Sequence, residues 1–250
     1  MTDELLSLQV LVVSRSRDDQ DLFRLAASSA RVPIEITEAD GAASAGRSMG
    51  AGFDLVFVDT ALGGEAVAQV ASAARATAKR PFTVLLSAPG AVPPFQTDAL
   101  AAKPSGLEEA RRLVDGSTRV RLPSRVMVVD DSATMRSIVR KILAATRFPL
   151  EVTEVEKGTE AIALARQLEF DIVFLDYNMP GFSGLETIDE FRREKRRLTL
   201  VLMSSTQDEA IAVRARARGI AFLKKPFFPA DMEAVLCSFY GLRALNPRRA

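Results

Sequence analysis

Runs of apolar residues alternate with helical patterns through the second half of the chain. The runs are rich in Val, Ile, Leu and Phe with little polar alternation, which is typical of strands covered on both faces. They lie at 126–129, 152–155, 172–175, 200–203 and 220–223. Between them, apolar residues at helical spacing, such as Met135, Ile138 and Val139, predict amphipathic helices. Five strand–helix units imply an open parallel sheet with helices on both faces.

The first half of the chain repeats the pattern of the second. FDIVFLDYNMPG at 170–181 matches FDLVFVDTALGG at 53–64. VMVVDD matches VLVVSR, TLVLMSS matches FTVLLSA, and Lys225-Pro226 matches Lys103-Pro104, all in the same order and at nearly the same offset. A period this long predicts two domains and not a solenoid. The expected fold class is therefore α/β, with two tandem doubly wound, five-stranded parallel sheets.

The joint between the two copies lies near residues 115–124. This stretch, DGSTRVRLPS, has turn residues at both ends and no sustained apolar period. We therefore predict a first domain at 1–117, a short linker at 118–123, a second domain at 124–243 and a tail at 244–250.

Polar side chains of the second domain stand at the ends of its expected strands. Asp130 and Asp131 follow the first strand, Asp176 the third, Ser204 the fourth and Lys225 the fifth. Taken singly they are uninformative, and the acidic pair could simply cap the following helix. Together they favour a site, because the carboxyl ends of the strands meet at one edge of a doubly wound sheet.

The chemistry of this set predicts phosphoryl transfer. Three carboxylates about 5 Å apart repel by roughly 3 kcal/mol per pair at an effective dielectric near 20, and a divalent cation removes that cost. Mg²⁺ prefers oxygen ligands and keeps several waters, so two carboxylates plus a backbone carbonyl are a suitable partial shell. Phosphoryl transfer needs a nucleophile and cations on the phosphoryl oxygens. Asp176 is the predicted phospho-acceptor, with Lys225 as a cation and Ser204 as a hydroxyl donor.

The stretches VVDDSATMRSIVRKIL and FLDYNMPGFSGLE resemble the receiver domains of response regulators, and the single-domain chemotaxis regulators in particular. The resemblance covers about 120 residues. It implies two tandem (βα)5 receiver, or flavodoxin-like, domains. It also implies that Asp130, Asp131 and Asp176 bind Mg²⁺ and that the backbone carbonyl of Asn178 adds a ligand. Ser204 and Lys225 are implied to contact the phosphoryl group. Phe222 takes the place of the aromatic switch residue, often Tyr in this family, that turns inward after phosphorylation.

The first domain keeps only part of this site. Ser14 and Arg15 replace the acidic pair, whereas Asp59, Ser87 and Lys103 remain. We expect this site not to hold Mg²⁺ and Arg15 to lie near Asp59 as a fixed cation, with a solvent-facing Arg15 as the alternative. Either arrangement makes Asp59 a poor acceptor. The domain is then a degenerate receiver, or pseudo-receiver, with a structural, dimerising or partner-docking role.

The stretch between Ser87 and Lys103 is shorter than its counterpart in the second domain. It contains Pro89, Pro93 and Pro94, which oppose a regular helix. We therefore expect the fourth helix of the first domain to be truncated or missing.

Composition limits the remaining possibilities. Lys plus Arg is 33 and Asp plus Glu is 32, so the net charge of +1 gives no general attraction to nucleic acid. The single Cys237, expected in the core, fits a cytoplasmic protein, and we expect neither a signal peptide nor a membrane span. The absence of histidine excludes a kinase that phosphorylates its own His. A partner or a small molecule must therefore supply the phosphoryl group.

These observations predict a two-component response regulator. A sensor histidine kinase or phosphotransfer protein phosphorylates Asp176, and the change re-shapes a protein–protein surface that binds a downstream protein or a second copy. We expect no attached output domain, no direct DNA binding, and no enzymatic activity beyond assisting its own phosphorylation and dephosphorylation.

Other functions stay open or fail on single residues. A phosphate sink or phosphorelay intermediate, and a structural or dimerising adaptor, are the alternatives. A dehalogenase-type phosphatase would need a second Asp at position 132, where the chain has Ser, and DDSAT lacks the glycines of a nucleotide-binding loop. Two basic stretches are solvated helix ends or a site for an anionic partner: Arg192, Arg193, Lys195, Arg196 and Arg197, and Arg214, Arg216 and Arg218.

Overall fold

The computed structural model describes residues 7–88, 97–181, 183–193, 198–206 and 209–245. Contacts divide the chain into two compact units. Unit 1 consists of Met1–Arg121 together with Cys237–Ala250, and unit 2 of Leu122–Leu236.

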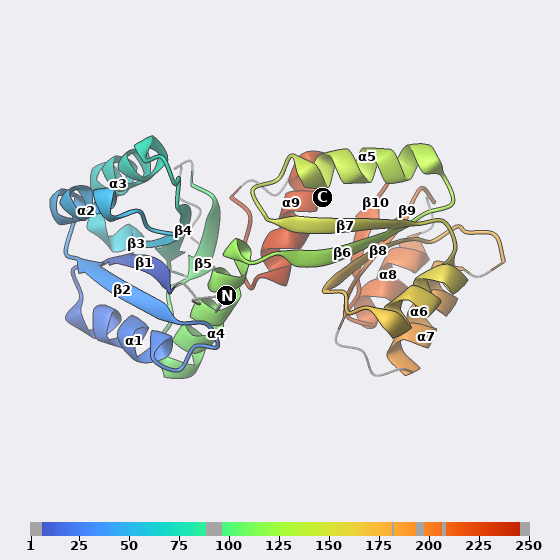
Figure 1. Ribbon diagram of the computed structural model, residues 1–250, viewed down its shortest axis with the longest axis horizontal. Helices are drawn as coiled ribbons and strands as arrows, with labels where there is room; N and C mark the ends of the chain where they lie inside the picture. Colours follow the sequence, from blue (N-terminus) through green and yellow to red (C-terminus); the bar gives the residue numbers. More distant parts are fainter. Residues whose placement is uncertain (1–6, 89–96, 182, 194–197, 207–208, 246–250) are drawn as a thin grey trace, which may run out of the picture. The chain divides into compact units, whose positions relative to one another are not determined.

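Unit 1 is built on a parallel sheet with the strand order β2-β1-β3-β4-β5. Its strands are β1 (Leu8–Val13), β2 (Ile34–Ala39), β3 (Leu55–Asp59), β4 (Phe82–Ser87) and β5 (Ala99–Ala102). Its helices are α1 (Arg17–Ala27), α2 (Ala42–Ser48), α3 (Gly64–Ala76) and α4 (Leu107–Thr118), with short 3-10 turns at η1 (Met49–Ala51), η2 (Thr60–Leu62) and η3 (Arg119–Arg121). Figure 1 shows α2 and α3 on one face of the sheet and α1 and α4 on the other. The expectation about the fourth helix concerns Pro89, Pro93 and Pro94, which lie outside the described residues.

Unit 2 repeats this topology with the order β7-β6-β8-β9-β10. Its strands are β6 (Ser124–Val129), β7 (Leu150–Val155), β8 (Ile172–Asp176), β9 (Thr199–Ser204) and β10 (Ala221–Lys224). Its helices are α5 (Ala133–Ala144), α6 (Gly158–Gln167), α7 (Gly184–Arg193), α8 (Glu209–Ala217) and α9 (Pro229–Phe239), whose last residues belong to unit 1. The predicted fold class, two tandem doubly wound parallel sheets, is confirmed.

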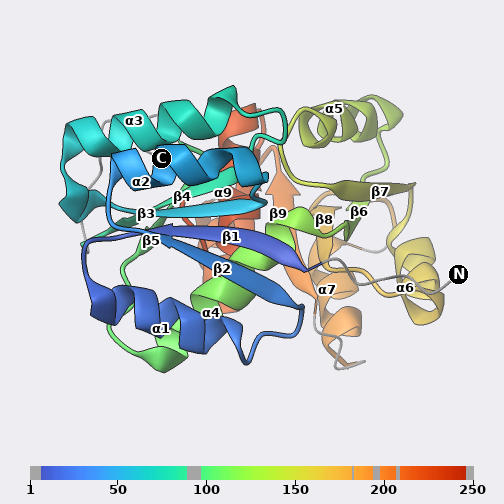
Figure 2. The same cartoon turned by 60° about the vertical axis from the view of Figure 1, so that its left-hand side comes forward.

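The burial of the strands follows their place in each sheet. Every residue of the central strands β3 and β8 is buried, because helices cover both faces. The edge strand β7 is half-exposed and carries Glu151 and Glu154, charges that discourage pairing with another chain. Figure 2 shows the layers of unit 1 from the side, with its sheet between the two helix pairs.

The predicted second domain ends at residue 243, whereas contacts assign residues from Cys237 onward to unit 1. Tyr240 and Leu242 are buried, and the backbone of Arg243 pairs with Leu100 on β5. The expected linker begins at the last residue of α4 and contains η3, so the chain stays regular up to Arg121. None of the helices in the described part of the chain is long and apolar enough to cross a membrane.

Candidate phospho-acceptor site

Three carboxylates meet at the carboxyl edge of the unit 2 sheet. Strands β6 and β8 are neighbours in register, with Val129 opposite Leu175, so Asp130 and Asp176 end side by side. Asp131 follows on the loop that leads into α5. Carboxylate oxygens of these three residues lie within 4.8 Å of one another. Asp130 and Asp176 are buried and Asp131 is exposed, so the cluster opens to solvent on one side.

Lys225 joins two of these carboxylates. Its Nζ donates to Oδ2 of Asp130 and to Oδ1 of Asp176, at 2.7 Å in each case. The side chain is 12% exposed, which places the ammonium group inside the cluster and not above it. The backbone N–H of Lys225 donates to the carbonyl of Ser204 at 2.7 Å, which brings the end of β10 to the end of β9.

Burial and charge act on the ionisation of this site in opposite directions. Burial raises the pKa of Asp176, and the charges of Asp130 and Asp131 add to the rise, which the bond to Lys225 offsets only in part. Burial alone would lower the pKa of Lys225, but its hydrogen bonds to Asp130 and Asp176 outweigh burial and raise it. The ammonium is therefore held in its charged form, while negative charge stays in excess around Asp176.

Three further residues were predicted for the site, and they lie on or just after the strands β8, β9 and β10. Ser204 is fully buried at the end of β9, and its hydroxyl accepts the backbone N–H of Thr206 at 3.2 Å. Phe222 lies on β10, half-buried against the hydrophobic core of the unit. Asn178, two residues after Asp176, is exposed.

The sequence that contains this cluster matches known proteins. The family model of the response regulator receiver domain fits residues 126–236. The nitrate/nitrite response regulator protein NarL of Escherichia coli (strain K12) is 32% identical over 111 residues, which are 44% of this chain and 51% of NarL. The chemotaxis protein CheY-3 of Vibrio cholerae serotype O1 is 30% identical over 115 residues, 45% of this chain and 88% of CheY-3. The chain belongs to the response regulator receiver family. The match lies within unit 2, which is therefore the receiver unit.

Solved structures extend the likeness to the whole fold. A crystal structure described as a putative two-component system response regulator/GGDEF domain protein aligns with 94% of this chain and 97% of its own, with a TM-score of 0.52. A second solved structure, described as a probable protein of this kind, aligns with 93% of this chain and 98% of its own, with a TM-score of 0.53. Both are 22% identical, which supports the shared tandem fold alone. The chain covers 51% of NarL and 45% of the transcriptional regulatory protein ResD of Bacillus subtilis, about half the length of these relatives.

Two residues that support the receiver site had been missed from the sequence. Arg136, in the first turn of α5, donates from Nη1 to the carbonyl oxygen of Asp130 at 2.6 Å. Gly184 begins α7, and a Cβ there would overlap with the carbonyl oxygen of Asp176. Gly184 lies within the FSGLE stretch, so its presence was visible, but nothing local indicated which backbone it approaches.

The structure also answers the helix-cap alternative. Ser132 is the N-cap of α5, since its hydroxyl accepts the N–H of Met135. Asp130 accepts the N–H of Ser132 with Oδ1, and its other oxygen binds Lys225. The acidic pair is therefore not the helix cap.

At the corresponding strand ends of unit 1, the polar side chains pair with one another. Lys103 Nζ lies 2.8 Å from Asp59 and 2.6 Å from Asp19. The hydroxyl of Ser14 donates to Asp19 at 2.7 Å and lies 3.4 Å from Asp59. Lys103 also donates its backbone N–H to the carbonyl of Ser87 at 3.0 Å, as Lys225 does to Ser204 in the receiver unit.

The predicted pairing of Arg15 with Asp59 is wrong. Arg15 is exposed, and no ion pair or hydrogen bond joins it to Asp59 within the described residues. Lys103 takes that place because it enters from the end of β5, and Asp19 supplies a second carboxylate from α1. Asp19 was missed, although it is the acidic residue three positions after the N-cap Ser16.

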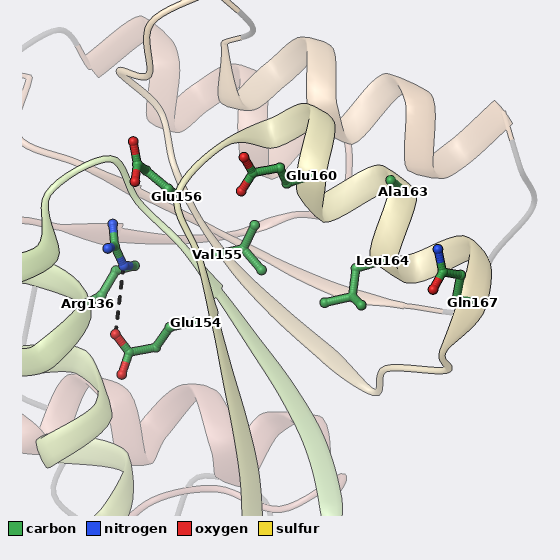
Figure 3. Close-up of a pocket in the computed structure, with 8 residues that line it drawn as sticks. All are labelled: Arg136, Glu154, Val155, Glu156, Glu160, Ala163, Leu164 and Gln167. Atoms are coloured by element: carbon green, nitrogen blue, oxygen red, sulfur yellow. Dashed lines mark ion pairs between the residues drawn. The ribbon is translucent and has the colours of Figure 1, made fainter.

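A cavity of about 560 Å³ lies beside the receiver site, between α5, β7 and α6. Figure 3 shows its lining, with the ion pair of Arg136 and Glu154 on one side and the apolar Val155 and Leu164 next to it. Arg136 Nε is 3.7 Å from Glu154, and Arg140 is 2.7 Å from the same carboxylate. Glu154 therefore has two cationic partners, and Arg136 connects this wall to the backbone of Asp130.

Two arginines of the basic stretches pair with acidic residues. Arg193 pairs with Glu190, and Arg218 lies 3.4 Å from Asp189. Residues 195–197 of the first stretch lie outside the described residues. These pairs favour the interpretation as solvated helix ends.

Proposed function

We propose that the receiver unit accepts a phosphoryl group on Asp176 from a partner histidine kinase or phosphotransfer protein. The observation that carries this proposal is Lys225, whose ammonium bonds to both Asp130 and Asp176 within a cluster of three carboxylates. Three carboxylates surround this one ammonium group, whereas the corresponding Lys103 of unit 1 is shared by two. Here negative charge remains in excess at a buried nucleophile, which suits a site that binds a metal and a phosphate.

The donor set fits Mg²⁺. Asp130, Asp131 and Asp176 offer hard oxygen ligands within 4.8 Å of one another, and one side is open for water and phosphate. We propose the carbonyl of Asn178 as a further ligand. A magnesium ion held there supplies positive charge that offsets the carboxylate repulsion and the charge of the transferred group.

The residues of the chain have separate roles in the transfer. A carboxylate oxygen of Asp176 attacks the phosphorus of the donor, the bond to the donor nitrogen or oxygen breaks, and an acyl phosphate forms. Lys225 then exchanges its bond to Asp176 for one to the phosphoryl oxygens, and the Ser204 hydroxyl donates to the same group. We propose that Phe222 turns inward with Ser204. This change would alter the surface around β9, β10, α8 and α9, where a downstream protein or a second copy binds.

We propose that unit 1 is a degenerate receiver. Its sheet order is the same, and the bond from Lys103 to Ser87 repeats the one from Lys225 to Ser204. Its acceptor position, Asp59, shares Lys103 with Asp19 and lacks the acidic pair. Unit 1 therefore offers a metal two carboxylates at this place, Asp19 and Asp59, and both are bound to Lys103.

We propose the span 124–243 for the phosphorylatable domain by sequence, with α9 as its last helix, although residues 237–243 group with unit 1 by contact. We expect the protein to act in the cytoplasm. Its one cysteine, Cys237, is a buried thiol that has no second cysteine in the chain to pair with, which suits a reducing compartment.

Intact mass after incubation with acetyl phosphate and Mg²⁺ tests the proposal. We expect one added phosphoryl group in the wild type and in Asp59→Asn, none in Asp176→Asn, and none in the wild type with excess chelator. An addition that survives in Asp176→Asn and disappears in Asp59→Asn would reverse the roles of the two units. A wild type that takes no phosphoryl group from acetyl phosphate or from phosphorylated histidine kinases would favour a structural adaptor. A phosphorylated form that captures no partner would favour a phosphate sink.

A further inference from the structure

The last helix of the receiver domain ends inside unit 1. Tyr240, directly after α9, is fully buried, and Leu242 is 3% exposed. The backbone groups of Arg243 and Leu100 exchange two hydrogen bonds of 2.8 Å each, which form an antiparallel bridge. Leu100 lies on β5, the edge strand of the unit 1 sheet. Residues 237–245, the C-terminal clasp, therefore cover an edge that would otherwise be open.

The clasp depends on a close backbone approach. Gly116 lies in α4, and a Cβ at this position would overlap with the carbonyl oxygen of Tyr240. The guanidinium of Arg119 lies 4.5 Å from the ring centroid of Phe239, within the range of a cation–π contact. Glycine is a poor residue for a helix interior, so its presence in α4 is explained by the space that the clasp needs.

The other end of α9 is tied to the phospho-acceptor site. Only three residues separate Lys225 from Pro229, where α9 begins. Phe227 is buried between them, and Met232 and Leu236 on α9 are fully buried. A phosphoryl group on Asp176 gives the Lys225 ammonium a new partner, so the segment that leads into α9 must adjust with it.

We propose that unit 1 is the built-in reader of the receiver unit, and that the clasp on α9 transmits the phosphorylation state of Asp176 to β5 and α4. This inference rests on the proposed function. A helix of three turns moves largely as one body, because its backbone bonds are internal. A shift of its first turn therefore changes how Tyr240 and Arg243, which follow its last turn, contact Gly116 and Leu100. Coupling of this kind is reciprocal, so a weakened clasp must change the affinity of the receiver site for a phosphoryl group.

Hydrogen exchange of the full chain tests the transmission. The phosphoryl mimic is beryllofluoride with Mg²⁺, and the reporters are the amides of Leu100 and Arg243. We expect their exchange rates to change at least about fivefold when beryllofluoride is added, and not to change in Asp176→Asn. A response at the amides of Lys225, Phe227 and Phe228 without one at Leu100 and Arg243 would overturn this inference alone. No response at any amide would overturn the proposed function together with it.

A pair of glycine variants tests the reciprocal effect. Gly116→Ala disturbs the clasp, whereas Gly46→Ala adds the same methyl group in α2, where nothing lies within 4 Å of the new Cβ. We expect the apparent affinity for beryllofluoride to shift at least about fivefold in Gly116→Ala and to stay at the wild-type value in Gly46→Ala. Equal affinities in the two variants would contradict the coupling.

Discussion

Asp176 has to remain ionised to accept a phosphoryl group, yet its surroundings oppose its charge. Burial comes first, and the charges of Asp130 and Asp131 add to it, so the pKa of Asp176 lies above the ordinary value of 3.8. Lys225 donates a hydrogen bond to Asp176 and compensates for part of this cost.

The raised pKa has a consequence for stability that depends on pH. The folded state binds the proton of Asp176 more tightly than the unfolded state, so ionised Asp176 costs stability. This cost is absent below 3.8, the pKa of Asp176 in the unfolded state, and it grows as pH rises through the pKa of Asp176 in the folded state. We therefore expect Asp176→Asn to raise the unfolding temperature at neutral pH without Mg²⁺, and the gain to shrink as pH is lowered towards 4.

Differential scanning calorimetry in chelator-treated buffer measures this effect. The control is Asp21→Asn, which removes an exposed carboxylate on α1 that pairs with Arg24, and here we expect a change below about 0.5 kcal/mol at any pH. A lower unfolding temperature for Asp176→Asn at neutral pH would show that the bond to Lys225 outweighs the repulsion.

Helices and strands position these side chains through backbone contacts as much as through side chains. The start of α7 touches the end of β8, where the N–H of Gly184 donates to the carbonyl of Tyr177 at 3.1 Å. The carbonyl oxygen of Asp176 occupies the space of a missing Cβ at Gly184. The acceptor loop is therefore held from outside the carboxylate cluster.

Gly184→Ala tests this contact. The new methyl group must displace the backbone of Asp176, so we expect a loss of about 1–3 kcal/mol in the free energy of unfolding and slower phosphorylation by acetyl phosphate. Gly46→Ala is the matched control, and we expect it to be neutral or stabilising by up to about 1 kcal/mol. Urea unfolding and intact mass against time measure the two effects. A Gly184→Ala variant as stable and as fast as the control would mean that the loop yields without cost.

The chain passes from one unit to the other twice, between residues 121 and 122 and between residues 236 and 237. Unit 1 is therefore incomplete as a continuous N-terminal segment. Its edge strand β5 and its helix α4 both use residues that follow the receiver unit in sequence.

Deletion of residues 237–250 should therefore damage unit 1, although unit 1 begins at the other end of the chain. Full burial of a large apolar side chain contributes about 1.5–3 kcal/mol, and the deletion removes both Tyr240 and Leu242 from the core. We expect faster hydrogen exchange in β5 and α4 than in the full chain. Deletion of 246–250 alone is the control, since it keeps every clasp contact described above. Unchanged exchange in β5 after the longer deletion would show that the clasp adds nothing to unit 1.

Local patterns in the sequence carried much of the fold and of the receiver site. Buried strands leave continuous apolar runs, and parallel strands align their carboxyl ends, so Asp130, Asp131, Asp176 and Lys225 could be placed together by counting from the strands. The repeated sequence pattern in the first half of the chain predicted a second sheet there. These features are readable because each depends on a few neighbouring residues and on one rule of sheet geometry.

Tertiary structure alone decided the contacts between segments that are distant in sequence. Lys103 and not Arg15 became the cation at Asp59, because the end of β5 aims its side chain inward while Asp19 approaches from α1. Residues 237–243 joined unit 1, because an edge strand accepts any backbone that reaches it with free N–H and C=O groups. Backbone pairing of this kind requires no particular side chain, and it therefore leaves no pattern in the sequence.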